Sequence, residues 1–324
     1  MNIYDFDKTI YKSDSTADFY FYCLKQYPSV LLWLPFQAWS FFLYILGFYT
    51  KTQFKERFYR FFKSIPDIEA SVRSFWNKKS CGIKKWYLEN HRDDDIIISA
   101  SPEFLLRPIC TQLGINHLIA SRVNPSDGRY DGFNCYGEEK VRRLHEQMGD
   151  IRAEYFYSDS LSDAPLAAIA DKGSYIVSGD KLTEWDKYKP GAVKKIVKMI
   201  FDREFLSFAF VGVINTINGV LFAYLFSLIF DANIAFAAGY ITSLTISYFL
   251  NSFITFRDTL SFMKYLKFAF SYVPNFVIQN VIVFVVYNLL GLDKVIAYIL
   301  AGIIGVPVTF LMMKLLVFTK TAKK

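Results

Sequence analysis

The chain has 324 residues, of which 53% are hydrophobic and 19% aromatic, and it carries a formal net charge of +7. This length gives room for about two domains, and the apolar content is high for a wholly soluble protein. The positive charge does not call for a nucleic-acid partner, because Lys and Arg gather beside long apolar runs, where they face anionic lipid. Most acids lie in residues 1–190 and the apolar excess in residues 205–318, so we expect a cytosolic domain followed by a membrane domain.

The first functional signal is an apolar strand start that runs directly into acids, Asn2-Ile3-Tyr4-Asp5-Phe6-Asp7. Alternate side chains of a strand share a face, so Asp5 and Asp7 are expected within reach of one bound group at the carboxyl end of a parallel strand. Two acids at this spacing suit a nucleophile and a proton donor assisted by a divalent cation. The alternative is that acids after a short strand only begin a turn or cap a helix.

A long helical region, residues 13–92, follows the first motif. Within it, the apolar segment 30–49 is long enough to resemble a membrane span. A single crossing would separate Asp5 and Asp7 from the later residues that complete their site. We therefore interpret this segment as a helix or broken helical hairpin in the membrane interface, and the alternative is a buried helix of a cap domain.

Later segments repeat the pattern of an apolar strand followed by polar side chains. A continuous apolar run ends at Ser99, just before a helix start, and this arrangement suits an anion. Lys140 lies in the first turn of an amphipathic helix, where a cation opposes the helix dipole and is better explained by a bound anion. A further strand pattern leads into Asp159 and Asp163, which suit a metal ligand and its supporting carboxylate. Taken alone, a serine that ends a strand or a surface lysine is common without any function.

In this order, Asp-x-Asp-x-Thr, a serine after an apolar strand, a lysine at a helix start and Ser-Asp-x-x-x-Asp resemble the haloacid dehalogenase superfamily of phosphatases over residues 1–180. The resemblance implies an α/β Rossmann-like core with a helical cap inserted after the first strand, as in phosphoserine phosphatases. Ser-Ala-Ser-Pro, Gly-Glu-Glu-Lys-Val and Tyr-Ser-Asp-Ser-Leu-Ser-Asp are most similar to the membrane-associated phosphatidylglycerophosphatase C type. Lys8 and Ser158 depart from the pattern, since glycine is usual at both positions.

The resemblance assigns roles to individual residues. Asp5 is implied to attack phosphorus and form an aspartyl-phosphate, while Asp7 protonates the leaving oxygen and then activates water. Mg²⁺ is implied to bind Asp5, the backbone carbonyl of Asp7 and Asp159, with Asp163 orienting the waters around it. The remaining expected contacts are to the phosphoryl group, from Ser99 and Lys140, and to the rest of the substrate, from Thr9, Lys8 and Ser101.

The second half of the chain begins with a basic amphipathic stretch, residues 181–204, which we interpret as a linker helix on an anionic membrane face. Four apolar spans follow, each long enough to cross a bilayer core of about 30 Å. They predict an all-α transmembrane domain in residues 205–324, with spans at about 205–230, 234–256, 265–289 and 295–318. The positive-inside rule places both termini and the first domain in the cytoplasm, because Arg257, Lys264 and Lys267 lie between the second and third spans and Lys320, Lys323 and Lys324 follow the fourth.

The pattern Phe208-Ala-Phe-Val-Gly-Val-Ile-Asn215, with Tyr248-Phe-Leu-Asn251-Ser-Phe-Ile-Thr-Phe-Arg257 closing the second span, is similar to the GtrA-like family of four-helix membrane proteins. That family is associated with moving polyprenyl-phosphate-linked sugars across membranes in cell-surface polysaccharide synthesis. The resemblance, over about residues 203–320, implies that Asn215, Asn251 and Arg257 contact lipid phosphate. The alternative is that buried amides only hold helices together. The sequence also allows a homo-oligomer that forms through these helices.

The sequence thus predicts a bacterial inner-membrane protein that joins a Mg²⁺-dependent phosphomonoesterase to a four-helix lipid-handling domain. The expected substrate is a membrane lipid phosphate monoester, either phosphatidylglycerophosphate or a polyprenyl-linked phosphosugar, and no nucleic acid is expected as a partner. The alternative is that the membrane half is itself a flippase or transporter of polyprenyl-phosphate-linked sugars. The phosphatase domain would then be an accessory or a regulator.

Overall fold

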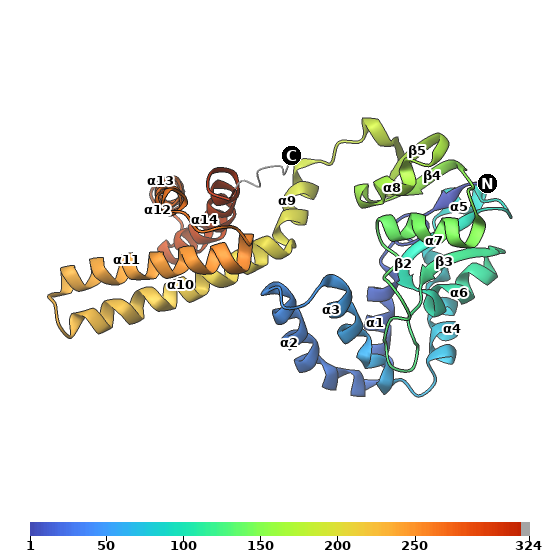
Figure 1. Ribbon diagram of the computed structural model, residues 1–324, viewed down its shortest axis with the longest axis horizontal. Coiled ribbons are helices and arrows are strands. Elements are labelled where there is room, and N and C mark those ends of the chain that lie inside the picture. The colour runs from blue at the N-terminus through green and yellow to red at the C-terminus, as the bar shows by residue number, and fades with distance from the viewer. Residues whose placement is uncertain (319–324) are drawn as a thin grey trace. The chain divides into compact units, whose positions relative to one another are not determined.

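The computed structural model describes residues 1–318, apart from the side chains of residues 275, 294, 295, 298 and 299. It divides into two compact units, Met1–Phe42 with Tyr49–Lys189 and Leu43–Phe48 with Pro190–Lys324. Figure 1 shows the order of the elements along the chain, from blue to red. The basic residues expected to orient the last span, Lys320, Lys323 and Lys324, lie outside the described residues.

A six-stranded sheet forms the centre of the first unit, with strand order β3-β2-β1-β4-β5-β6. Neighbouring strands are parallel except β5 and β6, which are antiparallel. Because parallel strands end at the same edge of a sheet, the residues that follow β1, β2 and β4 meet there. The strands are β1 (Ile3–Tyr4), β2 (Ile96–Pro102), β3 (His117–Ser121), β4 (Ala153–Ser158), β5 (Ala170–Ser178) and β6 (Lys181–Glu184).

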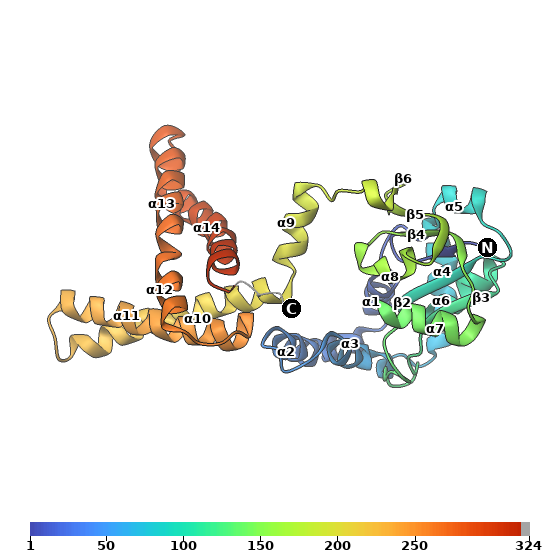
Figure 2. The same cartoon turned by 45° about the horizontal axis from the view of Figure 1, so that its top comes forward.

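Alternate residues of β2 enter two separate hydrophobic cores, one on each face of the sheet. Ile97 belongs to a core that includes Leu105 of α6, whereas Ile96 and Ile98 belong to a core that includes Leu144 of α7. The sheet is thus covered by helices on both faces (Figure 2), which confirms the predicted α/β core. The covering helices are α6 (Glu103–Gln112), α7 (Glu138–Met148) and α8 (Ala164–Ala167).

A helical insertion separates β1 from β2 and confirms the predicted cap after the first strand. Its interior is aromatic, since Phe19, Phe75 and Trp76 are almost fully buried. The rings of Phe75 and Trp76 pack edge to face, with centroids 4.8 Å apart. The cap consists of α1 (Ser15–Gln26), α2 (Leu34–Ile45), α3 (Lys51–Phe58), α4 (Ile68–Lys79), α5 (Lys85–Asn90) and the 3-10 helices Pro28–Trp33, Tyr59–Ser64 and Ser80–Gly82.

The apolar segment of the cap has one covered and one uncovered face. By length and composition, Pro28–Ile45 could cross a membrane. The covered face is joined to α1 because the hydroxyl of Tyr20 donates to Oε1 of Gln37 over 2.7 Å. On the other face, Leu32 is 81% exposed and Trp39 59% exposed. This segment therefore packs into the cap and also leaves an apolar surface open.

The region expected to be a linker helix, residues 181–204, differs from that prediction at its start. Lys181–Glu184 forms β6 and pairs with β5, with Ser178 opposite Lys181. The turn between the strands contains Gly179, whose φ of +63° costs glycine little. A two-residue turn of this kind favours a hairpin, so the sheet extends past residue 180. Only Ala192–Ile200 forms the basic helix, α9.

The second unit is built mainly from apolar helices, as predicted. Arg203–Ser227, Ala232–Phe256 and Phe262–Leu289 are each long and apolar enough to cross a membrane, and Leu300–Leu316 forms a shorter apolar helix. Nζ of Lys314 lies 2.5 Å from Oε2 of Glu204, which joins the last of these helices to the first. The elements are α10 (Arg203–Ser227), α11 (Ala232–Leu250), the π-helix Asn251–Phe256, α12 (Phe262–Phe270), α13 (Tyr272–Val283), the π-helix Phe284–Leu289 and α14 (Lys294–Leu316).

Candidate functional site

The first predicted acids lie at the carboxyl edge of the sheet. β1 ends at Tyr4, and Asp5 continues the pairing with β4 because its N–H donates to the carbonyl of Tyr157 over 2.9 Å. A tight turn follows, closed by two hydrogen bonds to the carbonyl of Phe6. The expectation that strand alternation places Asp5 and Asp7 on one face is therefore wrong, since the strand does not reach Asp7.

Lys140 joins two of the predicted acids. Its Nζ lies 2.7 Å from Oδ1 of Asp5 and 2.9 Å from Oδ2 of Asp163. Lys140 is only 2% exposed and Asp163 only 3% exposed, so this is a buried ion-pair cluster. Burial alone would lower the pKa of Lys140, but Asp5 and Asp163 outweigh it and raise that pKa, which keeps the ammonium charged.

Two further carboxylates, Asp163 and Asp159, act electrostatically on Asp5. Burial raises the pKa of Asp5, the ammonium of Lys140 opposes this, and the carboxylates of Asp163 and Asp159 raise the pKa further. Such a set of oxygen donors fits a hard divalent cation such as Mg²⁺. Within residues 1–318, no group of three or more His, Cys, Asp or Glu side chains is arranged around a common metal position. A cation here would thus use Asp5, Asp159 and backbone oxygen, with Asp163 occupied by Lys140.

Asp7 is held jointly by the start of the cap and the end of β2. The N–H of Ser15 donates to its Oδ1 over 2.7 Å, and the hydroxyl of Ser101 donates to its Oδ2 over 2.5 Å. The hydroxyl of Thr16 lies 3.1 Å from that of Ser101. Burial, followed by the charge of Asp14, raises the pKa of Asp7 to about 6, against the opposite effect of the two hydrogen bonds. A carboxyl group with this pKa is suited to giving and taking a proton near neutral pH.

The serine and threonine residues expected around the substrate are buried. Ser99 is buried, and its Oγ accepts a hydrogen bond from the N–H of Ser101 over 3.2 Å. Thr9 is fully buried, and its hydroxyl has no hydrogen-bond partner in the part of the chain that the structure describes. The hydroxyl of Ser101 contacts Asp7. A direct substrate contact from Ser99 or Thr9 therefore stays a prediction that requires the site to open.

Lys8 has a φ of +60°, in the left-handed region that residues other than glycine seldom adopt. This conformation accounts for the glycine that is usual at this position in similar proteins. Its carbonyl accepts a hydrogen bond of 2.6 Å from Nζ of Lys84, which also donates to the carbonyl of Gly179 over 2.6 Å. Lys84 thus joins the turn beside Asp7 to the β5–β6 hairpin, and no sequence pattern indicated this role.

The second departure, Ser158, supports one of the acids. Its hydroxyl donates to Oδ2 of Asp163 over 2.8 Å and accepts from the N–H of Ser160 over 3.1 Å. Ser158 therefore helps to orient the carboxylate that Lys140 also contacts. Glycine at this position would leave that oxygen with one hydrogen-bond donor fewer.

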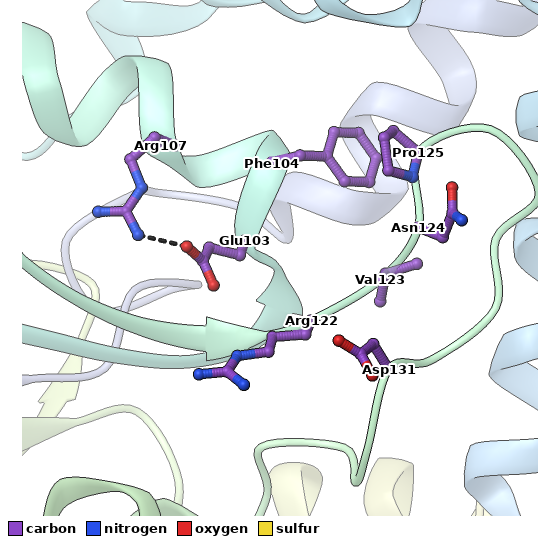
Figure 3. Close-up of a pocket in the computed structure, with 8 residues that line it drawn as sticks. All are labelled: Glu103, Phe104, Arg107, Arg122, Val123, Asn124, Pro125 and Asp131. Atoms are coloured by element: carbon purple, nitrogen blue, oxygen red, sulfur yellow. Dashed lines mark hydrogen bonds and ion pairs between the residues drawn. The ribbon is translucent and has the colours of Figure 1, made fainter. Parts of the chain in front are cut away.

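A cavity of about 560 Å³ opens where β3 ends and α6 begins (Figure 3). None of the predicted site residues lines it, so it is separate from the cluster around Lys140. An ion pair between Glu103 and Arg107 lies on one of its sides. The lining residues are Glu103, Phe104, Arg107, Arg122, Val123, Asn124, Pro125 and Asp131.

Two of the predicted membrane residues make contacts between or within helices. Asn215 borders a cavity of about 210 Å³ between α10, α11 and α13, and its Oδ1 accepts a hydrogen bond of 2.8 Å from Ser243. Asn251 is buried, and its Nδ2 donates to the carbonyl of Ser247 over 2.9 Å. Arg257 ends the π-helix with a φ of +52°. These contacts suit helix packing, and the cavity at Asn215 also leaves room for a ligand.

The sequence matches two family descriptions, haloacid dehalogenase-like hydrolase over residues 3–168 and GtrA/DPMS, transmembrane domain over residues 207–318. Protein CicA of Caulobacter vibrioides is 40% identical over 86 residues, which cover 25% of this chain and 39% of that protein. A probable phosphatase of Mycobacterium tuberculosis is 34% identical over 90 residues, 26% of this chain and 31% of that protein. A histidinol-phosphatase of Neisseria meningitidis is 32% identical over 107 residues, 28% of this chain and 47% of that protein.

The matched stretch spans less than half the length of each of these relatives. The first family match, in contrast, covers about half of this chain and includes strands β1 to β4, the cap and the cluster of Asp5, Lys140 and Asp163. The chain therefore belongs to the haloacid dehalogenase-like hydrolases, and its second half carries a GtrA/DPMS transmembrane domain.

Proposed function

We propose that this protein is a Mg²⁺-dependent phosphatase that hydrolyses a phosphate monoester carried by a membrane lipid. The observation that carries the proposal is that two carboxyl groups at the edge of the sheet, buried Asp5 and half-buried Asp7, have different partners. Asp5 is paired with the ammonium of Lys140, whereas Asp7 is held apart by Ser15 and Ser101 with a pKa of about 6. The names of two relatives, a probable phosphatase and a histidinol-phosphatase, point to the same class of reaction.

In the first step, a carboxylate oxygen of Asp5 attacks phosphorus, and the bond from phosphorus to the ester oxygen breaks. Asp7 donates its proton to that oxygen, so the alcohol leaves in neutral form. Lys140 and Ser99 offset the negative charge of the phosphoryl oxygens. Mg²⁺ bound by Asp5, Asp159 and the carbonyl of Asp7 would neutralise further charge between the nucleophile and the phosphoryl group.

In the second step, Asp7 takes a proton from a water molecule, which attacks the aspartyl-phosphate. The bond from phosphorus to the Asp5 oxygen breaks, phosphate leaves, and the carboxylate of Asp5 is restored. Asp163 keeps Lys140 in place through their ion pair, and Ser158 orients Asp163. The two steps together return every group to its starting protonation state once Asp7 has served first as acid and then as base.

Membrane-facing features support a lipid substrate. The uncovered face of the segment Pro28–Ile45 exposes Leu32 and Trp39. In α9, Val193 is 76% exposed beside the lysines, and Phe201, which directly follows α9, is 75% exposed. Such basic amphipathic helices bind anionic membrane surfaces. We therefore place the protein in the bacterial inner membrane, with the phosphatase domain and both termini on the cytoplasmic side. The candidate substrates are phosphatidylglycerophosphate and a polyprenyl-linked phosphosugar.

Phosphate release by the purified full-length protein in detergent tests this proposal. The esters to compare are phosphatidylglycerophosphate, a polyprenyl-linked phosphosugar, phosphoserine and histidinol phosphate, each with Mg²⁺ and with a chelator. We expect Mg²⁺-dependent hydrolysis of a lipid ester in preference to both soluble esters. A preference for phosphoserine or histidinol phosphate would overturn the lipid substrate, and absence of phosphate release from all four would overturn the phosphatase.

A second candidate function is transport of a lipid-linked phosphosugar by the transmembrane domain. It is favoured by the cavity at Asn215, because amide and hydroxyl groups that line a cavity inside a membrane often mark a binding or transport path. Asn251 and Arg257 would be further lipid contacts. Truncation at Arg203 separates the two functions. If the transmembrane domain serves only as an anchor, the truncated phosphatase keeps its activity on lipid in detergent.

A further inference from the structure

The turn that follows Asp7 is held by hydrogen bonds on both sides of Lys8. The backbone of Lys8 has a φ of +60°, a conformation that is unfavourable for any residue with a Cβ atom. Its N–H donates to the carbonyl of Ser13 over 3.0 Å, and its carbonyl accepts from Nζ of Lys84 over 2.6 Å. The Lys8 side chain is exposed. Backbone hydrogen bonds therefore hold this residue in the left-handed region.

Lys84 supplies one of these bonds from a buried position. The residue is only 8% exposed, and its ammonium donates to the carbonyls of Lys8 and Gly179, each over 2.6 Å. Within residues 1–318, no carboxylate forms an ion pair with Lys84. A buried lysine usually has an acidic partner. The two carbonyl contacts are thus the interactions that offset the lost hydration of this ammonium.

The backbone of Lys84 is fixed beside the same turn. Its N–H donates to the carbonyl of Ile10 over 2.9 Å, and the N–H of Lys12 donates to the carbonyl of Gly82 over 3.0 Å. These bonds pair the segment that leads into the cap with the segment that returns from it. The ammonium of Lys84 accordingly reaches Lys8 from a backbone that is itself held against the turn.

The conformation of Lys8 decides where the carbonyl of Asp7 points. This carbonyl, proposed above as an oxygen ligand of Mg²⁺, belongs to the peptide unit that joins Asp7 to Lys8. The φ angle of Lys8 is the rotation between that unit and the rest of the turn. The far side of the turn is fixed, because the N–H of Ile10 donates to the carbonyl of Phe6 over 3.0 Å. A change of φ at Lys8 would therefore rotate the carbonyl of Asp7 away from a cation that needs its oxygen ligands in place.

We propose that Lys84 is a positioning residue of the phosphatase site and that it compensates for the lysine at position 8, where glycine is usual in similar proteins. This inference rests on the proposed phosphatase function and adds a residue that acts through the backbone of the turn. Glycine adopts the left-handed conformation readily, so a turn with glycine at this position needs no such support. The reaction should therefore depend on Lys84 in the wild type and depend on it much less in Lys8→Gly.

Steady-state hydrolysis of p-nitrophenyl phosphate by the full-length protein in detergent, over a range of Mg²⁺ concentrations, tests the inference. The proteins to compare are the wild type, Lys84→Met, Lys8→Gly and the double variant. Lys84→Met keeps the length of the side chain and removes its donors. It is expected to lower kcat by about tenfold, as for a lost charged hydrogen bond, and to raise the Mg²⁺ concentration that gives half the maximal rate. KM at saturating Mg²⁺ should change by less than about twofold, because Lys84 does not touch the substrate.

The comparison of the two backgrounds decides the matter. In Lys8→Gly, the change Lys84→Met should lower kcat by no more than about threefold, because the two residues act through one conformation. An equal loss of kcat in both backgrounds would overturn the inference, and so would no loss in either. A rise of KM without a fall of kcat would also overturn it, since Lys84 would then contact the substrate.

Lys85→Met is the matched control, because Lys85 is the exposed neighbour of Lys84 and receives the same substitution. It should leave kcat and the dependence on Mg²⁺ unchanged. Hydrolysis of p-nitrophenyl phosphate by the wild type and its loss in Asp5→Asn report on the phosphatase function separately. Failure of the proposed function and failure of this inference are thus distinguished.

Denaturant unfolding with a chelator present gives a measurement that does not depend on activity. Lys84→Met should lower the midpoint of unfolding at least about twice as far in the wild type as in Lys8→Gly. Equal shifts of the midpoint would contradict the coupling of the two residues. If Lys84→Met alone does not fold, recovery of a folded protein in the double variant supports the inference, and a double variant that also fails to fold overturns it.

Discussion

The hydroxyl of Ser101 lies 2.5 Å from Oδ2 of Asp7, although 94 positions separate the two residues in the chain. Ser101 belongs to the last part of β2, and the N–H of Ser15, in the first turn of α1, donates to the other oxygen of the same carboxylate. The proposed proton donor is therefore positioned by the core and the cap together. Any movement of α1 relative to β2 changes the hydrogen bonds of Asp7.

Ser101→Ala is expected to raise the pKa of Asp7, because the lost hydrogen bond stabilises the ionised carboxylate. Asp7 must be protonated in the first step, so kcat/KM falls as pH rises through the pKa of Asp7, about 6 in the wild type. In Ser101→Ala this alkaline limb should move to higher pH by about one unit, measured with saturating Mg²⁺. Ser101→Thr keeps the hydroxyl and should keep the limb in place. Movement to lower pH would contradict the assignment of Asp7 as the acid.

Lys140→Met should destabilise the first unit, because it leaves Asp5 and Asp163 buried together without their cation. Removing one partner of a buried ion pair costs about 3–5 kcal/mol of unfolding free energy. The measurement is denaturant unfolding of the full-length protein with a chelator present, followed by tryptophan fluorescence. All tryptophans of the chain belong to residues 1–189, so their emission reports on the first unit alone: Trp33, Trp39, Trp76, Trp86 and Trp185.

The double variant Lys140→Met with Asp163→Asn is the companion to this measurement. Without Lys140, the carboxylates of Asp5 and Asp163 are buried together without a cation, and the double variant removes the second of them. It should therefore recover part of the unfolding free energy lost in Lys140→Met. A double variant less stable than the sum of the two single variants would show that Lys140 and Asp163 do not act as a pair.

Lys8→Gly should stabilise the fold by up to about 1 kcal/mol, because glycine relieves the cost of a left-handed conformation and loses part of that gain to chain entropy. Lys12→Gly is the control, because Lys12 lies nearby and has no positive φ, and it should be destabilising. If Lys8 also contacts an anionic head group, Lys8→Gly raises KM for the lipid ester and leaves KM for p-nitrophenyl phosphate unchanged. Loss of stability in Lys8→Gly would contradict the backbone argument.

The sheet edge was predictable because polar residues end apolar runs at Asp5, Ser99 and Asp159. A lysine at the start of a helix was likewise a usable signal, since a cation there is unfavourable unless an anion compensates it. The hairpin of β5 and β6 was not predicted, because β6 is short and polar and its turn at Gly179 was taken as the start of a linker. The expectation that alternate side chains of a strand share a face also failed for Asp7, because β1 ends at Tyr4.

The contacts of the cap could not be predicted from sequence. Ser15 acts through its backbone N–H, and Lys84 acts through contacts with two carbonyl groups. None of these depends on residue spacing near the motifs. Each depends on how a helical insertion folds back onto the edge of a sheet, and that is decided by long-range packing.

Asp5 as the nucleophile is tested most directly by mass spectrometry of the protein quenched in acid during turnover of a phosphate ester. We predict a phosphoryl group on the peptide that contains Asp5, removed by hydroxylamine as an acyl phosphate is and absent from Asp5→Asn, which should lose more than about a thousandfold in kcat. A phosphoryl group on a serine, or turnover without any phosphorylated protein, would contradict the mechanism.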